Sequence, residues 1–125
     1  MFFGTHLLLY SRDPEADRAF FRDILEIPAV DAGENWLIFA LPPAEMGIHP
    51  GEGAAAPPPS NLATATLYMM CRDLNETMAK LAAKGVPCAA VREAGWGSVT
   101  SIPLPGGSSV GLYEPHHPLA IQESK

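Results

Sequence analysis

The stretch Tyr10-Ser11-Arg12-Asp13 in the first half of the chain is matched by Met70-Cys71-Arg72-Asp73 in the second half. Arg12 and Arg72 are 60 residues apart (72 − 12 = 60), and Trp36 and Trp96 have the same separation (96 − 36 = 60). Ile27-Pro28 and Val86-Pro87 form a further pair, 59 residues apart (86 − 27 = 59). The last pair is Gly47-Ile48-His49-Pro50 and Gly111-Leu112-Tyr113-Glu114-Pro115. A repeat of this length, present twice and in the same order, predicts one supersecondary unit that has been duplicated.

Each copy is predicted to contain a strand, a helix and three short strands. The opening strands are expected at residues 5–11 and 63–71. Asp13 and Asp73 are the expected N-caps of the two helices, with Pro14 at the first helical position of one and Glu76 completing a capping box in the other. Gly85 is placed to end the second helix.

Length and composition favour one domain spanning residues 1–125. It is expected to comprise a first module at about residues 4–50, a linker rich in Gly, Ala and Pro at 51–61, and a second module at about 62–116. With 47% hydrophobic and 18% charged residues, the chain has the composition of a globular protein.

Charge and hydrophobicity exclude several classes of partner. The net charge is −6 with only eight Lys and Arg, which argues against nucleic acid because phosphate contacts need clustered basic residues. No apolar run approaches the roughly 18 residues of a membrane span, and the N-terminus lacks the features of a signal peptide. Two cysteines are too few for a disulfide framework, so we expect a cytoplasmic protein.

The repeated βαβββ order, the Arg-Asp entry to each helix and the closing phrase Pro105-Gly106-Gly107 to Pro115 resemble the glyoxalase/bleomycin-resistance/extradiol-dioxygenase proteins, the vicinal-oxygen-chelate superfamily. The resemblance runs from about residue 5 to about residue 118. It implies an α+β fold in which two tandem βαβββ modules form a cupped mixed sheet with helices on the outer face. It also implies a small-molecule site on the concave face and a homodimer. The superfamily carries lyases, dioxygenases, epimerases and metal-free binding proteins on one scaffold, so the resemblance does not fix an activity.

Alternation along the strands sorts side chains onto the expected concave face. The residues placed there are His6, Leu8, Tyr10, Gly47, His49, Leu67, Met69, Cys71, Gly111 and Tyr113. In metal-dependent relatives one ligand, usually His or Glu, lies on each of four strands. The resemblance places His6 at the first of these positions, and Leu67, Gly47 and Gly111 at the other three. Leucine and glycine side chains cannot coordinate a metal, so we expect the usual site to be degenerate.

A rearranged metal site is the alternative. His6 and His49 could hold Fe, Mn, Ni or Zn, with Glu114 as the nearest carboxylate, although alternation turns Glu114 away from the face of Tyr113 unless a bulge redirects it. His6 could equally be a hydrogen-bonded core residue, and His49 a solvated strand end. His116 and His117 are expected in an exposed tail.

The remaining candidates are aromatic or apolar. Tyr10 and Tyr113 could transfer a proton or simply form cavity walls, and Trp36 and Trp96 could stack a flat ligand or pack symmetrically in the repeat. The expected ligand contacts are Leu8, Trp36, Leu67, Met69, Trp96, Gly111 and Tyr113.

Three functions remain open from the sequence. We favour a metal-free protein that binds a small apolar or aromatic molecule and needs no cofactor. The second is a divalent-metal-dependent lyase or dioxygenase, in which the ion would act as a Lewis acid on vicinal oxygens. The third is a partner-binding domain, for which no exposed amphipathic helix is left over.

Overall fold

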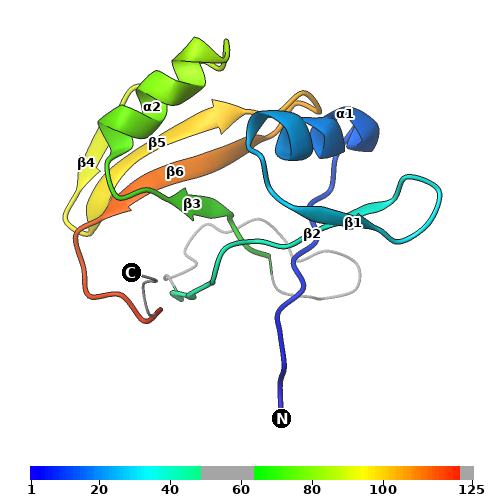
Figure 1. Ribbon diagram of the computed structural model, residues 1–125. Coiled ribbons are helices and arrows are strands. Elements are labelled where there is room, and N and C mark those ends of the chain that lie inside the picture. Colours follow the sequence, from blue (N-terminus) through cyan, green and yellow to red (C-terminus); the bar gives the residue numbers. More distant parts are fainter. Residues whose placement is uncertain (49–63, 122–125) are drawn as a thin grey trace. The chain divides into compact units, whose positions relative to one another are not determined.

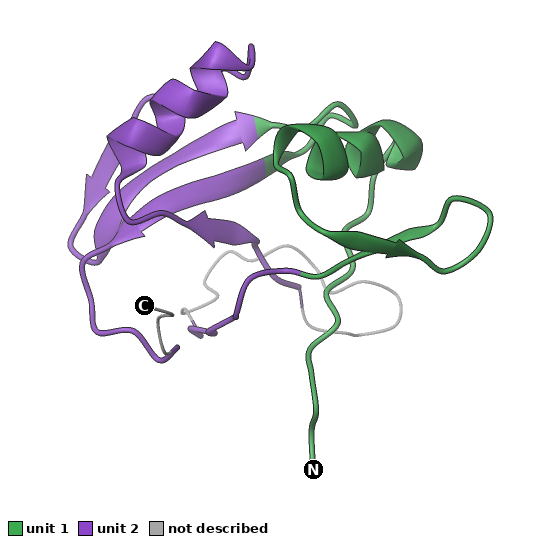
Figure 2. Cartoon of the chain, in the orientation of Figure 1, with its two compact units in different colours: residues 1–40, 103–109 green, residues 41–102, 110–125 purple. Residues whose placement is uncertain are grey.

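The computed structural model describes residues 1–48 and 64–121, so His49 and the predicted linker at 51–61 lie outside the described residues. The chain divides into two compact units (Figure 2). Unit 1 comprises Met1–Ala40 with Pro103–Ser109, and unit 2 comprises Leu41–Ile102 with Val110–Lys125. The fold class is α+β, as predicted. None of the helices in the described part of the chain has the length and hydrophobicity of a membrane span.

Unit 1 contains helix α1, Pro14–Ala19, which continues into a π-helical turn η1, Phe20–Ile24, and an antiparallel pair of strands, β1 Ala29–Asp31 and β2 Leu37–Phe39. The predicted N-cap is confirmed, because the Asp13 carboxylate accepts a hydrogen bond from the Ala16 N–H at 3.1 Å.

A buried carboxylate and a buried ring organise unit 1. The Phe21 side chain is 6% exposed, and its ring centroid lies 5.7 Å from that of Phe39 in β2. The carboxylate of Asp17 is also buried and accepts a hydrogen bond from the Gly106 N–H at 2.7 Å. A Cβ at position 106 would collide with the side chains of Asp17 and Ser11, so only glycine allows this close approach.

The opening strand predicted at residues 5–11 is not formed in this structure. Residues 1–11 have irregular backbone, and Leu8 and Tyr10 are 61% and 86% exposed. The prediction is wrong because β-branched and apolar residues form a strand only when a neighbouring strand satisfies their backbone groups. Two strands, not three, follow α1 in the described residues, since 40–48 carry none.

Unit 2 contains the predicted strand, helix and three strands (Figure 1). They are β3 Tyr68–Met70, α2 Leu74–Ala83, β4 Arg92–Ala94, β5 Gly97–Pro103 and β6 Ser109–Pro115. The sheet has the order β3-β6-β5-β4, with β3 parallel to β6 and β4 antiparallel to β5. The parallel pair requires a crossover, which α2 and the strands after it supply.

Both ends of α2 are fixed by the residues that the sequence singled out. The Asp73 carboxylate accepts from the Glu76 N–H at 3.0 Å, as an N-cap does. At the other end Gly85 adopts a φ of 79°, with its N–H bonded to the Ala82 carbonyl and the Val86 N–H bonded to the Leu81 carbonyl. This is a Schellman motif, and the side chains of Leu81 and Val86 are both buried.

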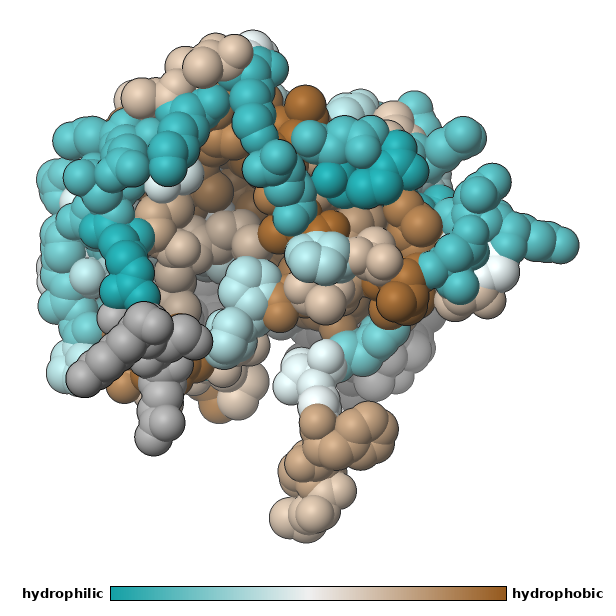
Figure 3. Space-filling model, viewed as in Figure 1, coloured by the Kyte–Doolittle hydropathy of each residue, from teal (hydrophilic) through white to brown (hydrophobic). Residues whose placement is uncertain are grey.

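The two faces of the unit 2 sheet differ in burial. Ile102, Val110 and Leu112 are at most 3% exposed, and Leu74 and Leu81 of α2 are buried as well. Figure 1 shows α2 lying along this sheet, and Figure 3 shows its outward side to be mainly hydrophilic. The core of unit 2 therefore lies between α2 and one face of the sheet, and the other face is left open.

The register of β3 corrects the predicted concave face. Met69 pairs with Leu112, and Tyr68 pairs with Gly111, so Met69 faces the buried core and Tyr68 faces the open side. Cys71, with the same parity as Met69, also lies on the core side. Leu67 shares that parity just before the strand. Residues 67–71 are apolar or aromatic throughout, so alternation does not distinguish the two faces of this strand. The predicted pattern was displaced by one residue, and the side chains expected on the concave face therefore lie on the core side.

Candidate functional site

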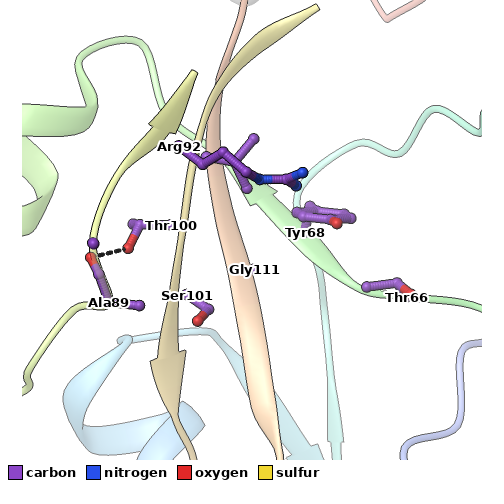
Figure 4. Close-up of a pocket in the computed structure, with 9 residues that line it drawn as sticks. Thr66, Tyr68, Ala89, Arg92, Thr100, Ser101 and Gly111 are labelled. Carbon is purple, nitrogen blue, oxygen red and sulfur yellow. Dashed lines mark hydrogen bonds between the residues drawn. The ribbon is translucent and has the colours of Figure 1, made fainter. Parts of the chain in front are cut away.

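The open face of the unit 2 sheet carries a hollow of about 350 Å³ (Figure 4). Its residues come from every strand of the sheet and from the segments that precede β3 and β4. Those used below are Thr66, Tyr68, Arg92, Val99, Ser101 and Gly111. Gly111 thus lies on the open face, and its role as a ligand contact stays a prediction. Volumes of this size are at the lower end of those of small-molecule sites in proteins.

Tyr68 occupies the space that a side chain at position 111 would need. A Cβ built on Gly111 would collide with three atoms of the Tyr68 ring, so the ring lies directly over the Gly111 backbone. The resemblance had assigned a metal-ligating glutamate to this position. In this chain the space is filled by an aromatic ring from the neighbouring strand.

Arg92 is the one cation among the residues that line the hollow. It lies in β4 beside Val99 of β5, and its side chain extends across the open face in the direction of Tyr68 (Figure 4). Among residues 1–48 and 64–121 no carboxylate pairs with it, in contrast to Arg22, which is bonded to Asp23 at 2.7 Å. No Asp or Glu is among the lining residues.

Two hydroxyls also line the hollow. The Thr100 hydroxyl donates to the Ala89 carbonyl at 2.6 Å and is therefore engaged (Figure 4). The hydroxyls of Thr66 and Ser101 make no hydrogen bond within the described part of the chain. They remain able to donate to a ligand or to accept from it.

Three aromatic side chains gather next to the hollow. Tyr68, Trp96 and Tyr113 contact one another edge to face, with ring centroids 5.3 to 6.3 Å apart. Trp96 is in the turn between β4 and β5, and its carbonyl accepts from the His116 N–H at 2.8 Å, which ties this turn to the end of β6. Tyr68 belongs to both the hollow and this cluster, which we call the aromatic cluster.

The Tyr113 phenol continues into a chain of polar groups. The Nδ1 atom of His117 lies 2.8 Å from the Pro118 carbonyl, which can only accept, so Nδ1 carries a hydrogen and donates it, which assigns the tautomer with a free Nε2 lone pair. The His117 Nε2 atom is then an acceptor, and Tyr113 donates to it at 3.2 Å. A carboxylate oxygen of Glu45 lies 3.8 Å from the same nitrogen. His117 was expected in an exposed tail, but it is half-buried and holds the Tyr113 ring in place.

Burial, reinforced by the negative charge of Glu45, raises the pKa of Tyr113 above its ordinary value. At neutral pH the phenol is therefore protonated and remains a hydrogen-bond donor. This arrangement suits a cavity wall with a fixed orientation better than it suits a nucleophilic phenolate.

Glu114 faces away from the hollow. One of its carboxylate oxygens accepts from the Leu74 N–H at 3.0 Å, at the start of α2, and the other pairs with His116 at 3.1 Å. The bond from Leu74, followed by that from His116, lowers the pKa of Glu114. Alternation had predicted this outward direction, and no bulge redirects the side chain, so Glu114 braces a helix instead of completing a metal site.

Four candidates of the first half, His6, Leu8, Tyr10 and Trp36, belong to unit 1, whereas Gly47 belongs to unit 2. His6, Leu8 and Tyr10 are exposed on the irregular N-terminal segment. Trp36 precedes β2 as predicted, and the Arg18 guanidinium carbon lies 4.8 Å from the centre of its ring, a cation–π contact. Their roles as ligand contacts stay predictions.

Within the described ranges, no three His, Cys, Asp or Glu side chains come close enough together to hold a metal ion. His49, half of the rearranged site, lies outside those ranges, so the His6/His49 site also stays a prediction.

Tyr68, Arg92 and Glu45 were not singled out by the sequence, and His117 was assigned to an exposed tail. A signal for Tyr68 existed, because a glycine inside a strand often marks a close approach by a neighbour, and Gly111 pairs with Tyr68. Glu45 and His117 are far apart in sequence, and no local spacing connects them.

Solved structures share the fold of this chain over most of its length. A lactoylglutathione lyase from Agrobacterium tumefaciens is 20% identical and aligns over 85% of this chain and 88% of its own, with a TM-score of 0.53. An antibiotic binding protein from Streptomyces sp. CB03234 is 20% identical over 89% of this chain and 99% of its own, with a TM-score of 0.57. A glyoxalase/bleomycin resistance protein from the same organism is 18% identical over 83% and 93%, with a TM-score of 0.54.

The chain has the glyoxalase/bleomycin-resistance fold. No protein-family model matches its sequence, and no curated protein matches it. At these identities the glyoxalase/bleomycin-resistance fold is shared, whereas activity depends on the residues of the site.

Proposed function

We propose that this chain is a small-molecule-binding protein of the glyoxalase/bleomycin-resistance type and that it binds its ligand without a metal. The ligand would lie in the hollow on the open face of unit 2. The observation that carries the proposal is the junction at Tyr68, which joins a 350 Å³ hollow to the aromatic cluster. An apolar and aromatic wall with a few polar groups is the usual composition of a small-molecule site.

The described side chains that line the hollow of the open face support ligand binding over metal-assisted catalysis, because they include no His, Cys, Asp or Glu to coordinate an ion. Gly111 stands where the resemblance places a carboxylate ligand, and Glu114 is engaged at the start of α2. One structural neighbour is described as an antibiotic binding protein. The metal-dependent alternative would need His6 and His49, and no contact of the described residues favours it.

Fluorescence of Trp96 provides a direct test. The chain has two tryptophans, so Trp36→Phe leaves Trp96 as the single tryptophan, inside the aromatic cluster. Titration with a panel of two- and three-ring aromatic compounds should then quench or shift its emission saturably. A ligand at about 100 times its Kd should stabilise the native state by about 2.7 kcal/mol and raise Tm by several degrees.

The control keeps the other tryptophan. Trp96→Phe leaves Trp36 on the Arg18 side chain of unit 1. Because the proposed ligand lies in the hollow of unit 2, the Trp36 emission should not respond to the same compounds, and a saturable response would instead favour the ligand contact predicted at Trp36. If no compound of the panel changes either the Trp96 emission or Tm at millimolar concentration, the binding proposal is wrong.

Metal content tests the metal-free part separately. Purified protein without a tag is incubated with Fe(II), Mn(II), Ni(II) or Zn(II), dialysed and analysed for bound metal. We expect only trace amounts. About one ion per chain that survives dialysis and is lost in His6→Ala would replace the metal-free proposal by the metal-dependent one.

The expected homodimer and cytoplasmic location form part of the same proposal. Cys71 and Cys88 are free thiols, which is compatible with a reducing compartment.

A further inference from the structure

We propose that the ligand of the hollow is a flat aromatic acid, whose carboxylate binds Arg92 while its rings lie against Tyr68 and Val99. This inference rests on the proposed function and names the chemical class of its ligand. The structural feature that carries it is a guanidinium that has no carboxylate partner in the described part of the chain and extends across an apolar floor toward an aromatic ring.

The charge of the hollow selects an anion. Arg92 lines it without an acidic partner among the described residues, although the chain has a net charge of −6 and acidic side chains outnumber basic ones. The hollow has no carboxylate of its own with which to bind a cation. A guanidinium presents several N–H donors in one plane and can bind both oxygens of a carboxylate.

The surface beside Arg92 selects a flat, apolar body. Gly111 contributes no side chain, and Val99 is only 7% exposed, so the floor is the sheet itself. The Tyr68 ring stands beside this floor over Gly111 and is held by edge-to-face contacts with Trp96 and Tyr113. Aromatic rings of a ligand gain most from such a preorganised ring in offset or edge-to-face geometry.

The single cation among the described residues of the hollow also limits the negative charge that its ligand can carry. One guanidinium can bind both oxygens of a monoanionic carboxylate, and the hydroxyls of Thr66 and Ser101 line the same hollow. A phosphate ester carries more charge, and the described residues that line the hollow include neither a second cation nor a glycine-rich loop for it. A carboxylate on two or three fused rings therefore fits both the charge and the volume of about 350 Å³.

The test uses two probes of the same shape, 2-naphthoate and its neutral amide 2-naphthamide. Isothermal titration calorimetry on the full chain at pH 7 and low salt measures both affinities. We expect naphthoate to bind about tenfold more tightly than naphthamide, as one charge-assisted contact at a partly exposed site provides. Raising the salt to about 0.5 M should weaken naphthoate binding severalfold and leave naphthamide binding unchanged.

The matched variants are Arg92→Gln and Arg12→Gln, which change the net charge equally. Arg12 is an exposed residue of unit 1 and does not line the hollow. Arg92→Gln should lower naphthoate affinity about tenfold and change naphthamide affinity less than twofold, whereas Arg12→Gln should change neither. Arg92→Lys, which keeps the charge but not the planar donor pair, should give an intermediate affinity for naphthoate.

Three results would overturn the inference: equal binding of the two probes at low salt, equal effects of the two arginine variants, or binding of neither probe. Saturable quenching of Trp96 by neutral aromatic compounds would then still uphold the proposed function. Loss of that response as well would remove both. The salt dependence of the unmodified chain decides the point even if Arg92→Gln folds poorly.

Discussion

At the scale of single residues, the site is shaped by a glycine in β6 and the tyrosine of β3 whose ring lies over it. Gly111 has no side chain at the position that the resemblance assigns to a metal ligand, and the Tyr68 ring fills that space. Introducing a glutamate at 111 alone would therefore place it against the ring. The two positions are coupled, so their substitutions should not be additive in stability.

Gly111→Ala tests this coupling. The added Cβ collides with the Tyr68 ring, so we expect a loss of about 1–3 kcal/mol in the free energy of unfolding, measured by urea denaturation. Gly95→Ala is the matched control, because a Cβ there meets no atom within 4 Å, and it should change stability by less than about 0.5 kcal/mol. Equal effects at both positions would argue against the close approach of Tyr68.

The pKa of Tyr113 provides a second prediction at this scale. Burial and the charge of Glu45 raise its pKa, so the Tyr113 phenol should ionise at a higher pH than an ordinary tyrosine. Ultraviolet absorbance at about 295 nm follows this ionisation during a pH titration. The late step should disappear in Tyr113→Phe and persist in Tyr10→Phe, because Tyr10 is 86% exposed.

At the scale of elements, the helix ends were predictable and the sheet faces were not. Asp13, Asp73 and Gly85 act through local backbone geometry, which their residue types determine. The face of β3 depends on its register with β6, and an apolar strand carries no local signal for that register. The prediction of an opening strand at residues 5–11 was wrong for a related reason, because local propensity does not provide the partner strand that its backbone would need.

In the candidate site, too, the residues that the local sequence marks were predictable, and those that depend on tertiary contacts were not. Gly111, Trp96 and Tyr113 were predicted because the duplicated sequence marks their positions. Gly111 lines the hollow and the other two lie next to it, while their roles as ligand contacts stay predictions. Arg92 was missed because a lone arginine in a short exposed strand has the same pattern whether it faces solvent or a hollow. Contacts such as that of Tyr113 with His117 become visible only when the chain has folded.

The Schellman motif at the end of α2 gives a prediction for Gly85. Its φ of 79° is in the left-handed region, and an added Cβ would meet no atom within 4 Å, so the cost of Gly85→Ala is conformational. We expect a loss of about 1 kcal/mol in the free energy of unfolding, with a smaller loss for Gly85→Asn because asparagine tolerates this conformation. Thermal or urea denaturation of the two variants distinguishes them, and an equal loss would contradict the assignment.

The brace between β6 and α2 should make stability depend on acid. The pKa of Glu114 is lowered in the folded chain, so its contribution is present above the ordinary pKa of about 4.5 and is lost as the pH falls through the lower folded value. Glu114→Gln retains an oxygen that can accept from the Leu74 N–H but has no charge. The stability difference between the unmodified chain and this variant should be largest near neutral pH and vanish in acid. A difference independent of pH would contradict the charge effect.

At the scale of the whole molecule, a chain with net charge −6 exposes apolar side chains near its N-terminus. Phe2 and Phe3 are at least 88% exposed, and Leu8 and Tyr10 at least 61%. Because the resemblance implies a homodimer, we expect this segment to be covered by a second copy. Sedimentation at about 10 μM should show a dimer that Leu8→Asp dissociates and that Met46→Asp, an exposed site in unit 2, does not. A monomer at all concentrations would contradict the expectation.

The bond between Asp17 and Gly106 joins residues that are 89 positions apart. Unit 1 consists of the first 40 residues and a short segment from 103 to 109, so it is discontinuous in the chain. Because a ribosome delivers the polypeptide from its N-terminus, α1 emerges long before the turn that supplies the partner of its buried carboxylate. Closing so long a loop costs entropy before any contact is gained. During synthesis unit 1 must therefore wait for residues 103–109. Unit 2 is discontinuous as well, and β6, which pairs with β3, is synthesised later still, so unit 2 cannot be completed before that segment of unit 1 has emerged.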